Sequence, residues 1–388
     1  MSQQSESWRD PLRNGYSAGD PLPEYGTACF LCHRLFADGA ERTEEDVVPR
    51  WLTRRLQLGN RSAALPNGQR LGYGQRTVPC CFDCNQRMSR EVERPVSEAF
   101  AAGFAAVESL TPVVLLLWLS KIYYGTRFRE TPLRTSASDP TSDAMLAHED
   151  LLARNDYLRR CILLGPNLLT LAAPAASILI FQAGKPRALQ DQFDLFVSTI
   201  PGVDMIALRA MDTFVIAIFS DNGYWARHLG DIKIVQHAAQ DLVLHPVQCV
   251  ELMTWFHAEV AAYASEGGFD FITITQSEGP PRAILWTNFE LVPSGAEPDQ
   301  LRYLRYGSFM RRVGQVIGQN PPFSEEESAQ VAAGILRPSL LLNVERDEPV
   351  QAHCFEPRCP GIFDLAGWRS DLPTCDACRA SPSPLAVE

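Results

Sequence analysis

The chain has 388 residues, of which 46% are hydrophobic and 21% are charged. These values are typical of a soluble globular protein, and the length is sufficient for two or three domains. No segment approaches the ~18–20 consecutive apolar residues that a membrane-spanning helix needs, which excludes a membrane-spanning protein.

The longest apolar run, Val113–Leu119, ends at Ser120-Lys121 and indicates a buried helix. The first residues, Met1 to Ser7, contain no apolar signal core, so we expect a cytoplasmic protein. In that reducing compartment the eleven cysteines are expected to bind metal as thiolates rather than to form disulfides.

The net charge of −11 is distributed unevenly. Residues 1–108 carry 13 Arg, no Lys and 14 acidic residues, a net charge of −1, whereas the rest of the chain carries −10. The acidity, which would repel nucleic acid, therefore lies mainly outside residues 1–108. Several arginines that follow an acidic run could contact phosphates, or they could form a solvated face. They are Arg50, Arg54, Arg55 and Arg61.

Residues 1–24 are rich in Ser, Gly and Pro and are predicted to form a flexible tail. Residues 25–108 are predicted to form a zinc-bound module, because they contain two short-spaced cysteine pairs. The pairs are Cys29-Phe-Leu-Cys32 and Cys81-Phe-Asp-Cys84. Four thiolates in two such pairs can surround one Zn²⁺ tetrahedrally. Cys80 could compete with its neighbour for the zinc, but the spacing favours Cys81.

An acidic run, Glu44-Glu45-Asp46, lies between the two cysteine pairs, and Asn85 directly follows the second pair. The side-chain oxygens of these residues are ligands of the kind that a hard divalent cation takes. One alternative for the run is a helix N-terminus, where Thr43 would cap the helix and the carboxylates would meet its dipole.

The module resembles the treble-clef branch of the HNH endonucleases, also called ββα-metal or His-Me finger nucleases. The resemblance covers about residues 25–108 and rests on the cysteine pairs and two longer motifs. The motifs are Glu45-Asp46-Val47-Val48-Pro49-Arg50-Trp51-Leu52 and Val78-Pro79-Cys80-Cys81-Phe82-Asp83-Cys84-Asn85. The resemblance implies a zinc-bound treble clef and an endonuclease that hydrolyses phosphodiester bonds, with nucleic acid, DNA above all, as its partner.

In the mechanism that the resemblance implies, Glu45 and Asn85 bind one Mg²⁺ or Mn²⁺ ion, with Glu44 and Glu93 as candidate outer ligands. The metal neutralises the scissile phosphate while the residue at position 46 activates water. The family has a His at this position, and this chain has Asp46. A carboxylate, with an ordinary pKa near ~3.9, is a weaker base than a His near ~6.5. The second hypothesis is therefore a catalytically silent protein, in which zinc holds a platform that binds nucleic acid or protein.

Apolar residues recur at helical spacing from Asn85 to Val107, and Pro95 predicts a kink or two abutting helices near Glu93-Arg94. The Gly- and Asn-rich stretch Gly59–Gly74 is predicted to be a loop. One helix is expected from Thr111-Pro112 to Gly125 and another from Ser142 to about Leu164.

Residues 109–345 are predicted to form an α+β domain, because runs of strand character joined by turns favour an antiparallel sheet with helices packed on it. Its histidines show no metal-ligand spacing, and Cys161 and Cys249 are interpreted as core thiols. The predicted strands are residues 177–183, 193–199, 205–210, 213–220, 232–235, 269–275 and 283–287. Further helices are predicted at residues 246–264, 300–317 and 324–336.

Residues 346–388 carry a second cysteine group, Cys354, Cys359, Cys375 and Cys378. Its spacing resembles that of a zinc ribbon, with His353 able to replace one thiolate. Such ribbons are structural sites without an open coordination position, so we expect a second structural zinc there.

Overall fold

The computed structural model describes residues 23–65, 67–139, 141–185, 189–200, 202–228, 243–244, 246–266, 268–274, 282–293, 351–353 and 362–364. Within them the chain is α+β, as predicted. It divides into two compact units, one of residues 1–175 with 268–288 and one of residues 176–267 with 289–388. In this described part, no helix has both the length and the apolar character that crossing a membrane requires.

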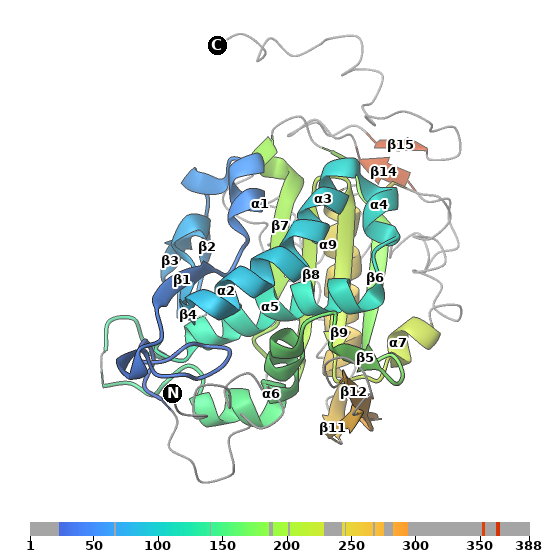
Figure 1. The fold of residues 1–388 in the computed structure, drawn as a ribbon. Helices are drawn as coiled ribbons and strands as arrows, with labels where there is room; N and C mark the ends of the chain where they lie inside the picture. The colour runs from blue at the N-terminus through green and yellow to red at the C-terminus, as the bar shows by residue number, and fades with distance from the viewer. Residues whose placement is uncertain are drawn as a thin grey trace. The chain divides into compact units, whose positions relative to one another are not determined.

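The acidic run of the first unit lies in a two-stranded antiparallel sheet (Figure 1). Strand β1 (Arg42–Asp46) pairs with β4 (Thr77–Cys81), and Glu45 lies opposite Val78. The alternative of a helix N-terminus is therefore wrong, because pairing with β4 holds the backbone of the run in an extended conformation. Helix α1 (Arg50–Arg55) begins only after Pro49.

The connection from α1 to β4 is more regular than the predicted loop. It contains the 3₁₀ turns η4 (Leu58–Asn60) and η5 (Tyr73–Gln75) and a hairpin of β2 (Ser62–Ala64) with β3 (Arg70–Gly72). Gly68 has a φ of 83°, and its N–H donates to the carbonyl oxygen of Leu65. Glycine thus marks the turn of a hairpin here, because only glycine adopts this backbone conformation freely.

Helix α2 (Phe82–Met88), the π-helical turn η6 (Ser89–Glu93) and helix α3 (Arg94–Ala102) follow one another without a gap. Of the predicted kink or two abutting helices near Glu93-Arg94, the structure shows two abutting helical segments, because the π-helical η6 ends at Glu93 and α3 begins at Arg94. Pro95 lies in the first turn of α3, and its missing N–H cannot donate to the preceding turn, which is where the π geometry occurs. A short helix, α4 (Phe104–Glu108), completes this segment.

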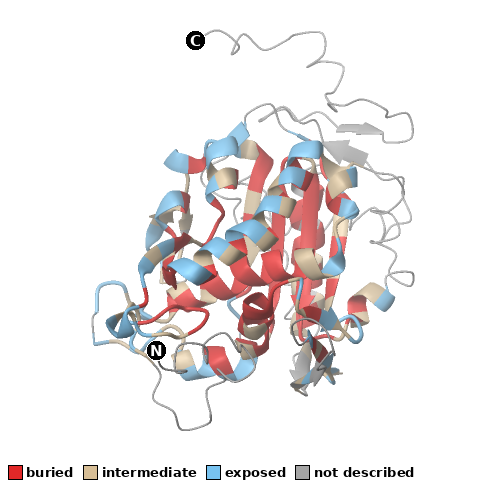
Figure 2. Ribbon diagram, viewed as in Figure 1, coloured by how far each residue is buried: buried red, intermediate tan, exposed pale blue. Residues whose placement is uncertain are grey.

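Helix α5 (Pro112–Glu130) is buried along most of its length and packs against α6 (His148–Leu164) (Figure 2). It continues past Gly125, where the sequence predicted its end. A Cβ at Gly125 would lie 3.5 Å from a methyl carbon of Val47, an ordinary van der Waals distance, so α5 packs here against the segment after β1. Helix α6 begins later than predicted, because the Ser142 hydroxyl donates to the carbonyl oxygen of Asp139 in a turn.

The first unit also contains a three-stranded sheet of β5 (Leu169–Leu171), β11 (Phe269–Ile274) and β12 (Arg282–Thr287). Strand β12 lies in the middle, antiparallel to β11 and parallel to β5.

The second unit contains the predicted antiparallel sheet, with strand order β6-β9-β8-β7. Its two central strands are buried at every position. Side chains of α9 (Pro246–Ala261) share one apolar core with this sheet. The four strands are β6 (Ala176–Gln182), β7 (Phe193–Val197), β8 (Met205–Ala210) and β9 (Thr213–Phe219).

Smaller elements of the second unit are the helix α7 (Tyr224–Arg227) and the paired strands β10 (Tyr263–Glu266) and β13 (Glu290–Pro293). The strand predicted at 232–235 and the helices predicted at 300–317 and 324–336 lie outside the described residues. So do the four C-terminal cysteines, Cys354, Cys359, Cys375 and Cys378.

Candidate functional site

The two cysteine pairs of the first unit meet at one buried point. Cys29 and Cys32 precede β1, whereas Cys81 ends β4 and Cys84 lies in the first turn of α2. Their four Sγ atoms lie within 4.8 Å of one another. Sulfurs bound to zinc at ~2.3 Å in a tetrahedron lie about 3.8 Å apart, and the Sγ atoms of Cys32 and Cys81 are 3.7 Å apart. The group is compatible with zinc binding, as the spacing predicted.

Cys80 lies beside this group without belonging to it, with its Sγ 4.0 Å from that of Cys29. Burial raises the pKa of the Cys29 thiol, but hydrogen bonds from neighbouring thiols outweigh burial and hold that pKa well below its ordinary value. Hydrogen bonds with Cys29 and its neighbours, together with burial, raise the pKa of Cys84. The thiols therefore compete for ionisation, and a bound dication would allow all four ligands to ionise.

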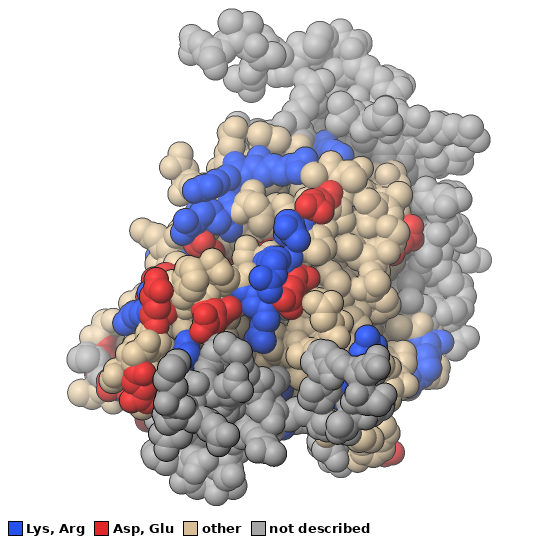
Figure 3. Space-filling view, in the orientation of Figure 1, with Lys and Arg blue, Asp and Glu red and all other residues tan. Residues whose placement is uncertain are grey.

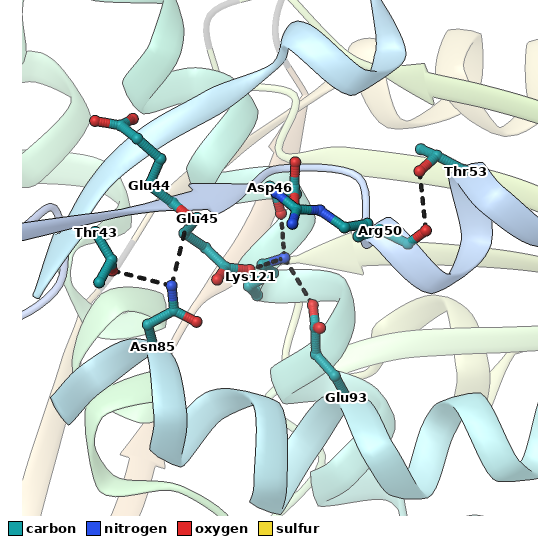
Figure 4. Close-up of polar contacts among 9 residues, drawn as sticks. All are labelled: Thr43, Glu44, Glu45, Asp46, Arg50, Thr53, Asn85, Glu93 and Lys121. Carbon is teal, nitrogen blue, oxygen red and sulfur yellow. Dashed lines mark hydrogen bonds and ion pairs between the residues drawn. The ribbon is translucent and has the colours of Figure 1, made fainter. Parts of the chain in front are cut away.

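Lys121 of α5 reaches the acidic strand from the interior of the unit (Figure 4). Its Nζ lies 2.5 Å from Oε1 of Glu45 and 2.8 Å from Oε1 of Glu93, and it also donates to the backbone carbonyl oxygen of Asp46. The side chain of Lys121 is 1% exposed and that of Glu45 is 8% exposed. Three oxygens from β1 and η6 thus surround a cation that belongs to the chain.

The charges of this group depend on one another. Burial alone would lower the pKa of Lys121, but the carboxylates of Glu45 and Glu93 outweigh burial and raise it. Burial raises the pKa of Glu45, and Lys121 opposes that shift. Lys121 therefore carries its positive charge at neutral pH and offsets the repulsion between the two carboxylates.

The side chains of Asp46 and Asn85 make different contacts. Oδ2 of Asp46 accepts a hydrogen bond from Nε of Arg50 at 3.0 Å. Nδ2 of Asn85 donates to Oγ1 of Thr43 at 3.0 Å and to the carbonyl oxygen of Glu44 at 3.5 Å. The structure thus brings Glu45 and Glu93 together around Lys121. The side chains of Asp46 and Asn85 instead bond to Arg50, Thr43 and the backbone of Glu44, so Lys121 contacts only the carbonyl oxygen of Asp46 among these groups (Figure 4).

Sequence reasoning did not single out Lys121, although a signal was available. The chain has only three lysines, Lys121, Lys185 and Lys233. Lys121 lies in a predicted helix, directly after the seven apolar residues Val113–Leu119 and Ser120. A lysine in such a position cannot extend its ammonium to water, so it requires a buried acidic partner.

The histidines of the second unit do not form a comparable group among the described residues. Nε2 of His257 lies 3.0 Å from Oγ of Ser198, and burial lowers the pKa of His257 to about 4. His228 stacks on the ring of Tyr224.

Comparison with known proteins found no family model, no curated protein and no solved structure that matches the chain.

Proposed function

We propose that the first unit is a zinc-stabilised binding module, built on an HNH-like treble clef, that does not cleave nucleic acid. The observation that supports this proposal is the position of the Lys121 ammonium, which bonds to Glu45, Glu93 and the carbonyl oxygen of Asp46. Glu45 is a ligand that the HNH resemblance assigns to the catalytic cation. In this chain the side chain of Lys121 supplies positive charge at that ligand.

An ammonium and a divalent cation cannot occupy the same point. Mg²⁺ requires about six oxygens at ~2.0–2.1 Å, several of them from water. For the metal to enter, the Lys121 ammonium would have to leave its two carboxylates, and its neighbours Ser120 and Ile122 are both fully buried. A buried ammonium without partners costs several kcal/mol. Lys121 also offers no open coordination position at which water could become a nucleophile.

The residue at position 46 supports the same proposal. Hydrolysis in the HNH manner needs a base that activates water, and the chain has Asp46 where the family has His. The Asp46 carboxylate is bound by the guanidinium of Arg50. Two separate requirements of the reaction, the cation and the base, are therefore altered together.

The competing function is the Mg²⁺- or Mn²⁺-dependent nuclease that the resemblance implies. The closeness of Glu45, Glu93 and Asn85 around β1 and the α2–η6 segment favours it. This function requires a metal to displace Lys121, or to bind at oxygens that Lys121 does not contact.

A plasmid-nicking assay with the full chain in Mg²⁺, Mn²⁺ or EDTA distinguishes the two functions. We expect no metal-dependent nicking by the natural protein. We also expect Lys121→Ala to gain a Mn²⁺ site, detected by electron paramagnetic resonance, whereas the control Lys185→Ala gains none. Lys185 suits this purpose because it is half exposed and paired with Asp212 in the second unit. Nicking by the natural protein that Glu45→Gln abolishes, with zinc content unchanged, would overturn the proposal.

A further inference from the structure

Residues 47–81 differ in charge from the rest of this acidic chain. They contain six arginines and neither Asp nor Glu, although the whole chain has a net charge of −11. The arginines are Arg50, Arg54, Arg55, Arg61, Arg70 and Arg76. This segment runs from the end of β1 to the end of β4, and it contains α1, η4, the β2–β3 hairpin, η5 and β4 itself.

Five of these arginines reach the surface, and we call them the arginine surface. Arg50, Arg54, Arg55 and Arg70 are exposed and Arg61 is half-buried, whereas Arg76 is buried. Helix α1 packs against η4 and η5, which flank the hairpin, so the five side chains belong to one continuous part of the unit. Figure 3 shows basic side chains gathered on the edge where Figure 1 places α1.

The charge of the arginine surface is only partly balanced within the described residues. Arg50 pairs with Asp46, and Arg70 donates to the hydroxyl and the carbonyl oxygen of Ser62. Arg54 and Arg55 lie side by side at the end of α1, and neither forms an ion pair with a described acidic residue. Their guanidinium groups can therefore bind an external anion without breaking an internal pair.

We propose that the arginine surface binds the phosphate backbone of a nucleic-acid duplex. This inference rests on the proposed binding function and names the partner of that function. A planar guanidinium binds two phosphate oxygens at once, and every cation of this surface is an arginine. The acidic remainder of the chain repels a polyanion elsewhere and so directs it to this surface.

The aromatic residues of the segment favour a duplex over a single strand. Single-strand binding sites stack bases on exposed rings. Here the Trp51 ring packs against Phe100 and Trp118, and Tyr73 is buried. Tyr73 belongs to the core and the half-buried Trp51 already packs on two core rings, so the arginine surface contacts the backbone and binds without strong sequence preference.

The test measures binding of the full chain to a fluorescent 30-base-pair duplex DNA of random sequence by anisotropy, over a range of salt concentrations and without added Mg²⁺ or Mn²⁺. The test variant is Arg54→Gln/Arg55→Gln. The matched control is Arg134→Gln/Arg154→Gln, which removes the same charge from exposed positions in the same unit. Zinc content and circular dichroism show that each variant is folded.

We expect the test variant to bind about tenfold more weakly at low salt, and its slope of log K against log salt to fall by about 1.8, since each lost phosphate contact lowers the slope by ~0.9. The control should retain both values. The proposal would be overturned if the test and control variants bound the duplex equally well, or if the protein bound a single strand of the same length more tightly. It would also be overturned if Arg54 and Arg55 were needed for binding to phosphatidylserine vesicles and the protein did not bind DNA. Metal-dependent nicking by a protein that still binds the duplex through Arg54 and Arg55 would refute the proposed lack of cleavage. It would leave the proposed duplex binding in place.

Discussion

The Nζ atom of Lys121 and the Oε1 atom of Glu45 lie 2.5 Å apart in the buried part of the first unit. This ion pair joins α5 to β1 and, through Glu93, to the π turn that follows α2. The acidic strand is thereby neutralised by the fold itself. Both the stability of the unit and its expected lack of nuclease activity depend on this pair.

Replacing Lys121 by Met should destabilise the first unit by about 3–5 kcal/mol, because Glu45 and Glu93 would be left buried without their cation. Urea unfolding measures this change. The double variant Lys121→Met/Glu45→Gln should lose less than the sum of the two single changes, since one buried charge is removed with its partner. A cost below about 1 kcal/mol for Lys121→Met would show that the ion pair contributes little.

Introducing the His of the HNH endonucleases by Asp46→His should not produce a nuclease, because Lys121 would still bond to Glu45. A nicking assay in Mn²⁺ checks this expectation, with Asp46→Asn as the control that removes the charge without adding an imidazole. Activity is expected only when Asp46→His is combined with Lys121→Ala. Nicking by the single Asp46→His variant would mean that the lysine does not block the cation site.

Cys32→Ser should abolish zinc binding by the first unit and unfold it, because a zinc bound by the four cysteines would join the segment before β1 to the start of α2. The matched control is Cys80→Ala, which changes a buried cysteine 4.0 Å from Cys29 that does not belong to the four-sulfur group. Zinc content by mass spectrometry and circular dichroism provide the two measurements. Loss of zinc in the control together with retention in Cys32→Ser would reverse the ligand assignment.

Deleting residues 346–388 should remove about one zinc per chain and leave the zinc of Cys29, Cys32, Cys81 and Cys84 in place. This expectation rests on the spacing of Cys354, Cys359, Cys375 and Cys378 alone. Metal analysis of the truncated and full chains compares the two stoichiometries. An unchanged zinc content would reject the ribbon.

Glu130 should make the first unit less stable as the pH rises towards neutrality. Burial raises the pKa of Glu130 from about 4.5 to about 7, although Arg127 lies 2.5 Å away and opposes the shift. A carboxyl whose pKa is raised on folding stabilises the fold below its unfolded pKa, and this contribution is lost as pH rises through the folded value. The loss between about pH 4.5 and 7 is at most about 3 kcal/mol.

Urea unfolding of the natural protein and of Glu130→Gln at pH 5 and pH 7.5 measures the effect. The variant should show the smaller change between the two values, because its amide does not titrate. An identical pH dependence in both proteins would assign the titration to another group.

The cysteine group that is compatible with zinc binding and much of the secondary structure were accessible from sequence, because both depend on short-range patterns. The spacing within each cysteine pair was enough to predict which four sulfurs meet, and Pro95 marked the change of helix geometry near Glu93. The alternating and continuous apolar runs likewise predicted the sheet of the second unit.

Only the tertiary structure decided what surrounds the acidic run. Its residues suit a helix cap as well as a strand, and pairing of Glu45 with Val78 across β1 and β4 selected the strand. The cation that Glu45 meets comes from α5, far along the chain, and no local pattern connects Lys121 to β1. A buried lysine needs acidic partners inside the protein, because its ammonium is shielded from water. Packing of α5 against β1 therefore determined which cation pairs with Glu45, and residue spacing in the sequence does not encode such long-range packing.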